Sequence, residues 1–229
     1  MPNREEEHNA IAETDYHPAI IMEEKLYPTY QAKIKEVNQH DMLSALNEIQ
    51  TNESSWSYQS TIGAIFNNRH AIFCNIYRSI KGIFDSENVI GGLQVYRHFI
   101  CSCLISGKVV GIIIFNPAKS NIPNNNVDQI AFILTYPNGY GYGGLLVQHV
   151  VNISLESDHK GILNVRAEHD AEIFYQKLGF NYIKSNNFLS LKQMSLDPDT
   201  SDKWHRINGK YQLKRIPRPR NTNWQCHLL

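Results

Sequence analysis

The sequence is poor in the features that mark secreted, zinc-binding or membrane-spanning proteins. Its four cysteines are Cys74, Cys101, Cys103 and Cys226, and no two of them form the Cys-x-x-Cys pair of a structural zinc site. Cys101 and Cys103 stand two apart in a strand-like run, so they share a face and are badly placed to bridge each other. We therefore expect reduced thiols that pack within a strand, no metal, and a cytoplasmic protein.

Long apolar runs and an excess of one charge are missing as well. The longest apolar run, Val109 to Phe115, is far too short to cross a membrane. The chain begins with acidic residues, which does not fit a secretory signal. Lys plus Arg and Asp plus Glu number 22 each, so no global basic field exists to attract nucleic acid. We therefore expect no direct nucleic-acid partner.

The C-terminal part departs from this even charge. Seven Lys or Arg and no carboxylate lie between Lys203 and Arg220. The sequence ends in Cys226-His-Leu-Leu, which loosely fits a prenylation signal. A solvated edge and an accidental cysteine explain the same residues, so both interpretations stay open. We expect contact with a membrane only if Cys226 is lipidated.

Between a polar arm at residues 1–28 and a tail at residues 217–229, the sequence predicts one domain over residues 29–216. Period-two and helical patterns alternate along it. Strands are expected at residues 30–37, 93–105, 108–115, 127–134, 161–167, 180–183, 188–194 and 211–216. Helices are expected from Asp41 through Ile49, over residues 62–83 and 145–155, and from an N-cap at Asp170 to Gly179.

A glycine-rich turn, Asn138-Gly-Tyr-Gly-Tyr-Gly-Gly144, separates one of these strands from an amphipathic helix. Glycine permits positive φ and lets a ligand approach the backbone closely. The first N–H groups of the following helix have no partner inside the helix, and its dipole favours an anion there. The turn therefore suits a phosphate or a pyrophosphate.

Two families of protein use such a turn. Gly139-x-Gly141-x-x-Gly144 matches the dinucleotide-binding fingerprint, and an acid, Glu168, lies at the end of the next strand. That fold needs several further βα units. The chain beyond Glu168 is short, and its pattern predicts mostly strands. The fingerprint match alone is therefore weak support for a dinucleotide site.

The second family fits two motifs in order. Asn138-Gly-Tyr-Gly-Tyr-Gly-Gly-Leu-Leu resembles the pyrophosphate turn of the GNAT superfamily of N-acetyltransferases, with Gly141 and Gly143 at its two small positions. Asn138 stands where Gln or Arg is usual. Downstream, the run Ala171-Glu-Ile-Phe-Tyr-Gln-Lys-Leu-Gly-Phe180 resembles the second motif of the superfamily. The resemblance covers about residues 29–195.

This resemblance implies an α/β (α+β) fold with a mixed, mostly antiparallel sheet of six to seven strands flanked by helices. It also implies an acetyltransferase that uses acetyl-CoA and transfers the acetyl group directly in a ternary complex. The residues that it places at the cofactor are Leu134, Thr135, Asn138, Gly139, Tyr140, Gly141, Tyr142, Gly143, Gly144, Glu168, Phe174 and Tyr175.

The same resemblance makes Tyr175 the candidate general acid. A tyrosine with its ordinary pKa of about 10 is protonated at neutral pH and can donate to a leaving thiolate; simple packing in the core would explain it too. Asp128 and Glu168 are the candidates for the general base. The alternative function is a degenerate module that binds a CoA thioester or a protein without turnover. The acceptor amine and the oligomeric state stay open.

Overall fold

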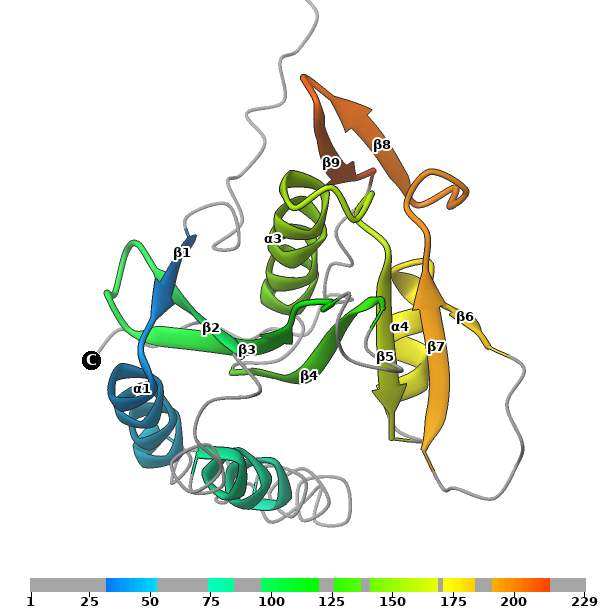
Figure 1. Cartoon of the computed structure of the whole chain (residues 1–229). Coiled ribbons are helices and arrows are strands. Elements are labelled where there is room, and N and C mark those ends of the chain that lie inside the picture. Colours follow the sequence, from blue (N-terminus) through cyan, green and yellow to red (C-terminus); the bar gives the residue numbers. More distant parts are fainter. Residues whose placement is uncertain are drawn as a thin grey trace, which may run out of the picture.

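The computed structural model describes residues 32–52, 74–84, 96–119, 126–136, 141–168, 171–183 and 191–214 (Figure 1). The expected arm at residues 1–28, the tail at residues 217–229 and Cys226 lie outside the described residues. So do Asn138, Gly139 and Tyr140 of the glycine turn and the predicted N-cap Asp170. The predicted domain bounds, 29–216, stay a prediction.

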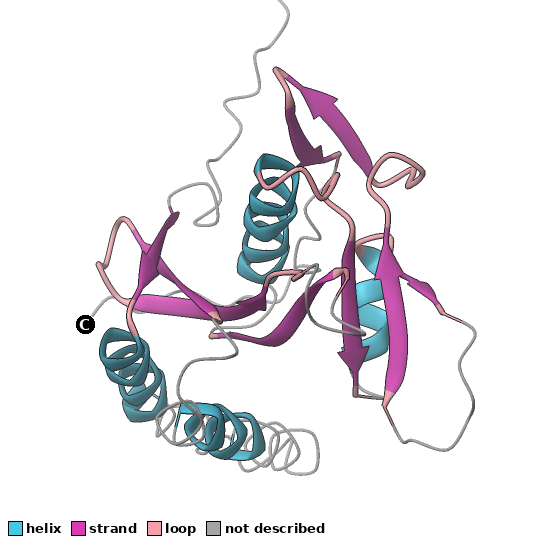
Figure 2. Cartoon of the chain, in the orientation of Figure 1, coloured by secondary structure: helices cyan, strands magenta, loops and turns pink. Residues whose placement is uncertain are grey.

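A seven-stranded sheet forms the centre of the structure, and Figure 2 shows its strands in magenta. The strand order is β1-β2-β3-β4-β5-β7-β6. Its strands are β1 Ala32–Val37, β2 Arg97–Cys103, β3 Val109–Asn116, β4 Asp128–Thr135, β5 Leu163–Ala167, β6 Asn181–Tyr182 and β7 Lys192–Leu196. Every neighbouring pair is antiparallel except β4 and β5, which run parallel. The predicted fold class, a mixed and mostly antiparallel sheet flanked by helices, is confirmed.

Helices cover both faces of this sheet. The helix α1, Gln39–Asn52, and the helical residues 74–84 lie on one face, where Met42, Leu46 and Ile49 are fully buried. On the other face lie α3, Tyr142–Glu156, and α4, Glu172–Lys177 (Figure 1). The apolar faces predicted for α1 and α3 therefore pack into two separate cores, one on each side of the sheet.

Two predicted helix starts need correction. The first helix begins at Gln39, before Asp41, because the Asn38 side chain accepts the Asp41 N–H at 2.8 Å and caps the helix. The N-cap of α4 is Ala171, which makes no capping side-chain hydrogen bond. The predicted end of that helix is confirmed, since Gly179 has a φ of 90°, which favours glycine.

A second, two-stranded sheet follows β7. It consists of β8, Trp204–Ile207, and β9, Lys210–Leu213, which pair antiparallel. The sequence patterns predict β9 but miss β8. This hairpin packs on α3, whose Asn152 side chain accepts the Tyr211 N–H at 2.8 Å and donates to the Tyr211 carbonyl at 2.9 Å. One turn earlier, Gln148 accepts the Leu213 N–H at 2.9 Å. Two helix side chains thus satisfy backbone groups of β9 as a neighbouring strand would.

Aromatic anchors complete the docking of the hairpin. The indole N–H of Trp204 donates to the Leu178 carbonyl at 2.7 Å, at the end of α4. The Tyr211 ring lies over Gly161, where an added Cβ would approach it to 3.0 Å, and its hydroxyl donates to Asp199 at 2.5 Å. The hairpin is therefore a built-in part of the core around α3.

No helix in the described ranges combines the length and apolar character that crossing a membrane needs.

Candidate active site

The two parallel strands at the centre of the sheet part from each other. The strand β4 pairs with β5 at only three positions, the last of them Ile130 with Val165. Beyond it, β4 continues to Thr135 with β3 on its other side, while β5 continues to Ala167 beside β7. Ala131 is the extra residue of a bulge in β4, since Ile130 and Phe132 face successive residues of β3. The bulge coincides with the point where the pairing stops.

The open edge of β4 presents backbone groups toward the gap. The Tyr136 N–H donates to the Val110 carbonyl of β3 at 2.9 Å. Because backbone groups alternate in direction along a strand, those of Leu134 also face β3, whereas those of Ile133 and Thr135 face the gap. Leu134 was expected at the cofactor together with Thr135. In the structure, the backbone N–H groups that point into the gap are those of Ile133 and Thr135. Those of Leu134 point to β3, because neighbouring residues of a strand direct their N–H groups to opposite sides.

The glycine turn ends at the N-terminus of α3, and that helix begins within the predicted turn. Gly141 is the residue before the helix and has a φ of 81°, which favours glycine. The helix begins at Tyr142, three residues before its predicted start at Leu145, so Gly143 and Gly144 belong to its first turn. Their N–H groups precede the first helical hydrogen bond, from Leu145 N–H to the Gly141 carbonyl. The helix N-terminus therefore lies directly behind the turn, where it can bind an anion.

Gly143 connects the two motifs that carry the family resemblance. A Cβ added at Gly143 would lie 2.9 Å from the Phe174 ring and 3.9 Å from the Thr135 methyl group. The Phe174 ring thus covers the first turn of α3 beside the end of β4. Phe174 is only partly buried, at the border of the core. The missing side chain at Gly143 lets three elements meet at the mouth of the gap.

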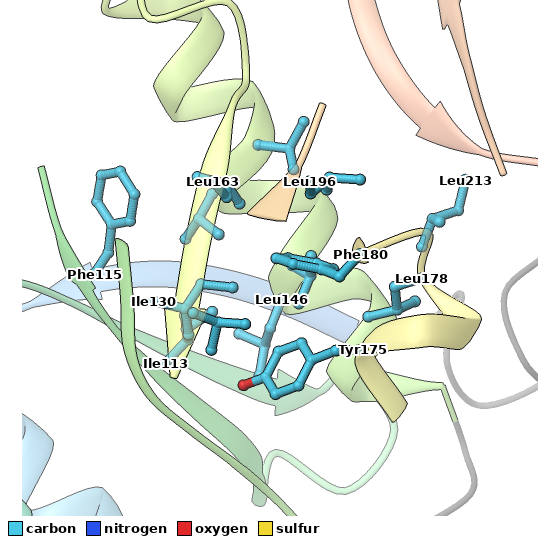
Figure 3. Close-up of a cluster of buried hydrophobic side chains, with 14 of the residues drawn as sticks. Ile113, Phe115, Ile130, Leu146, Leu163, Tyr175, Leu178, Phe180, Leu196 and Leu213 are labelled. Atoms are coloured by element: carbon cyan, nitrogen blue, oxygen red, sulfur yellow. The ribbon is translucent and has the colours of Figure 1, made fainter. Parts of the chain in front are cut away.

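Tyr175 lies deeper, between α4 and the sheet. Its ring packs edge-on against Phe174 and Phe180, with centroids 5.0 Å and 5.2 Å apart. Figure 3 shows the ring beside Leu146, with the hydroxyl turned away from α4 and toward the sheet. Burial raises the pKa of the Tyr175 phenol above its usual range, because the charged form is desolvated. The group is therefore protonated throughout the neutral range, as a general acid requires.

Asp128, one of the two expected bases, lies at the paired end of β4. Its carboxylate accepts the Ala118 N–H at 2.6 Å and contacts Nδ1 of His159 at 3.0 Å. The side chain is only 1% exposed. These contacts join the segments around Ala118 and His159 to the first residue of β4. The whole length of β4 lies between Asp128 and the glycine turn. The disposition of Asp128 therefore supports a structural role and disfavours the expectation that it acts as the base.

Glu168, the other expected base, directly follows β5 at its carboxyl end. Its side chain is exposed, and its backbone carbonyl accepts the Ala171 N–H at 2.9 Å, which starts the connection to α4. The carboxyl ends of β4 and β5 border the gap from its two sides. Of the two acids, Glu168 is the one positioned at the open end.

A shallow hollow on the sheet surface was missed by sequence reasoning. It measures about 210 Å³ and is lined by Gln129, Asn164, Val165, Arg166, Ile183 and Gln193. Four of these side chains are polar and come from β4, β5 and β7. The available signal was the alternation of β5, in which Leu163, Val165 and Ala167 are buried and the polar residues between them are not.

The cysteines pack as expected. Cys101 and Cys103 are both buried on one face of β2 and unbridged. Burial raises the pKa of the Cys101 thiol to about 12. For Cys103, hydrogen bonds from Ser106, Ile105 and Tyr142 outweigh the effect of burial and lower the pKa. The intervening strand β3 separates both thiols from the gap. Among the described residues, no group of three His, Cys, Asp or Glu side chains could hold a metal ion.

The structure is similar to solved acetyltransferases. The PaiA N-acetyltransferase of Thermoplasma acidophilum, in complex with coenzyme A, is 13% identical with a TM-score of 0.47, and the match covers 72% of this chain and 98% of that one. A Desulfovibrio desulfuricans protein described as a GNAT-family acetyltransferase is 12% identical, with a TM-score of 0.49 and the same coverage. The yncA protein of Salmonella typhimurium, with acetyl-CoA, is 16% identical, with a TM-score of 0.42 and coverage of 75% and 96%.

No family model and no curated protein matches the sequence. The mixed, mostly antiparallel sheet of seven strands with helices on both faces is nevertheless the architecture that the GNAT resemblance implies. At the level of the fold, the resemblance seen in the sequence is confirmed.

Proposed function

We propose that this chain is an N-acetyltransferase that moves the acetyl group of acetyl-CoA to an amine by direct transfer. The observation that carries the proposal is the gap between β4 and β5 beside the N-terminus of α3. A linear cofactor with a pyrophosphate at its middle needs an extended slot with hydrogen-bonding edges and an anion site next to it. The open edge of β4 and the first turn of α3 supply these two parts side by side.

The residues present fit acetyl-CoA. The N–H groups of Gly143 and Gly144 would hold the pyrophosphate, and glycine at position 143 lets the Phe174 ring pack against this end of the helix. The backbone groups of Ile133 and Thr135, directed into the gap, would hold the pantetheine arm and polarise the thioester carbonyl. When bound, acetyl-CoA supplies an activated acyl group. Asn138, Gly139 and Tyr140 remain part of the proposed turn.

Two side chains would move protons in the reaction. Glu168 would accept the proton that the amine loses as its nitrogen forms the new C–N bond. Tyr175 would donate its hydroxyl proton to the sulfur as the C–S bond breaks, and it would regain a proton from solvent. Since one proton leaves the amine and one reaches the thiol, the transfer is balanced. A buried, neutral Tyr175 suits the second role.

An assay of thiol release tests the proposal. The full chain is incubated with acetyl-CoA and a panel of primary amines, and the free thiol is measured beside calorimetric binding of acetyl-CoA. We expect binding and amine-dependent release. Binding without release on any amine would favour the alternative, a module that binds a CoA thioester without turnover. A lack of both would contradict the proposal.

We also propose that one domain, residues 29–216, carries this activity in the cytoplasm.

A further inference from the structure

The polar hollow lies on the sheet at the base of the gap. Gln129 and Asn164 face each other across the next-to-last β4–β5 pair, and Val165 belongs to the last pair. The buried side of β5, formed by Leu163, Val165 and Ala167, packs toward α3 and α4. Asn164 and Arg166 therefore point to the opposite face of the sheet. That face is the one on which α1 lies further along.

Among the described residues, Arg166 is the only cation that lines this hollow, and within the same residues its guanidinium has no hydrogen-bond or ion-pair partner. This differs from Arg97, which makes two hydrogen bonds of 2.8 Å to the Glu36 carboxylate. The other polar side chains of the hollow are the amides of Gln129, Asn164 and Gln193, which carry no charge. As far as the structure describes it, the lining therefore combines one positive charge that has no ion-pair partner with neutral hydrogen-bonding groups.

Glu168 stands next to this charge. It follows Arg166 by two residues, so continued alternation puts both side chains on the same face, with Cα atoms about 7 Å apart. Arg166 is closer to the base of the gap and Glu168 closer to its mouth. A ligand that spans the two positions meets an anion-binding group at one end and a carboxylate at the other.

We propose that the acceptor is a small amine that also carries a carboxylate, and that Arg166 binds this carboxylate in the hollow. A guanidinium presents a planar fork of donors that matches the two oxygens of a carboxylate. The three amides complete the binding site, and Glu168 faces the amino group that is to be acetylated. The proposal rests on the acetyltransferase function and adds the class of acceptor. A volume of about 210 Å³ is small for a ligand site, so the bound part has few heavy atoms.

The experiment compares ω-amino acids of increasing chain length with their carboxamides, which have the same shape without the charge. Thiol release is measured with acetyl-CoA for wild type, Arg166→Gln, Arg166→Lys and the control Arg78→Gln, an exposed arginine of the helical residues 74–84. We expect kcat/KM for the best amino acid to exceed that of its carboxamide by at least about tenfold. Arg166→Gln should reduce this preference to less than about twofold, and Arg166→Lys should retain part of it. Arg78→Gln should behave as wild type.

The outcomes separate this proposal from the function on which it rests. Turnover that is equal for amino acids and carboxamides, or highest for putrescine, would overturn the carboxylate proposal and leave the acetyltransferase intact. A preference for phosphoethanolamine over the amino acids would overturn the carboxylate in favour of a phosphate. If no amine is turned over, calorimetric binding of the amino acids decides. Binding that Arg166→Gln abolishes and Arg78→Gln keeps would support the ligand class, and no binding would overturn it.

Discussion

The two ends of the β4–β5 pair differ in what lies beside their polar groups. At the paired end, Asp128 is buried and its oxygens meet both the Ala118 N–H and the His159 ring. At the other end, the strands separate after Ile130 and Val165, and backbone groups of β4 face a gap. Buried polar groups are normally hydrogen-bonded, so the paired end needs no ligand to be stable. The open end is where we propose that a ligand binds.

The two ends of the pair are therefore suited to different roles. Asp128 is the first residue of β4 and Glu168 directly follows β5, so both are acids at the end of a central strand and their residue types do not separate them. Their surroundings do, because one is committed to structural hydrogen bonds and the other is exposed beside the gap. Substitutions at the open end should therefore change catalysis or binding. Substitutions at the paired end should change stability.

The largest effect is expected for Tyr175→Phe, at the open end. Removing the hydroxyl deletes the proposed proton donor and keeps the ring that packs on Phe174 and Phe180. We expect kcat to fall by about 10²-fold or more, while the dissociation constant for acetyl-CoA changes less than about twofold. Tyr211→Phe is the matched control, since it removes a buried phenol far from the gap. An unchanged kcat in Tyr175→Phe would assign Tyr175 to packing alone.

Asp128→Asn should have the next largest effect, and on stability rather than on rate. The substitution keeps the size of the side chain but weakens the hydrogen bonds to Ala118 and His159 in a buried site. We expect the free energy of unfolding to drop by about 1–3 kcal/mol in urea titrations, with kcat within about twofold of wild type. A large loss of kcat with unchanged stability would instead return Asp128 to the reaction.

Gly143→Ala should weaken acetyl-CoA binding by about tenfold, or about 1.4 kcal/mol. The added methyl group would lie 2.9 Å from the Phe174 ring, so the ring must move at the mouth of the gap. Gly82→Ala is the control, because nothing lies within 4 Å of its added Cβ. That variant should be slightly more stable than wild type, since alanine favours a helix. Equal affinities in calorimetry for both variants would remove Gly143 from the site.

The smallest effect concerns alkaline pH at the paired end, where the Tyr211 ring packs on Gly161. Burial, and then the hydrogen bond to Asp199, raise the pKa of Tyr211 from 10.0 to about 12. A raised pKa in the folded state means that the stabilisation is complete below pH 10 and is lost as the pH rises toward 12. In urea titrations, the free energy of unfolding of Tyr211→Phe should fall less steeply with rising pH than that of wild type, by up to about 1.4 kcal/mol per pH unit. An identical alkaline slope in both proteins would contradict the assignment.

Much of the fold was predictable because apolar periodicity determines which faces are buried. Met42, Leu46 and Ile49 follow a helical spacing and do close a core. The strand β8 was missed because its Trp204 and His205 lie in a basic, polar run. The hairpin of β8 and β9 docks through Leu178 and through side chains of α3, all of which are distant in sequence. Local patterns carry no information on such partners.

The candidate site was predictable in part. The glycine cluster and Tyr175 follow from motif residues and their order, and the structure brings Gly143, Phe174 and Thr135 together. The choice of Ile133 over Leu134 depends on the register with β3, which a one-residue change reverses. The hollow around Arg166 is lined by β4, β5 and β7, which come from three separate parts of the chain, and no local pattern shows that they are neighbours.

A crystal structure of the full chain with bound coenzyme A tests the central claim most directly. We expect the pyrophosphate on the N–H groups of Gly143 and Gly144, the pantetheine arm along Ile133 and Thr135, and the sulfur within hydrogen-bonding reach of the Tyr175 hydroxyl. A cofactor bound elsewhere on the sheet, or a gap filled by side chains while coenzyme A binds at another surface, would contradict the account.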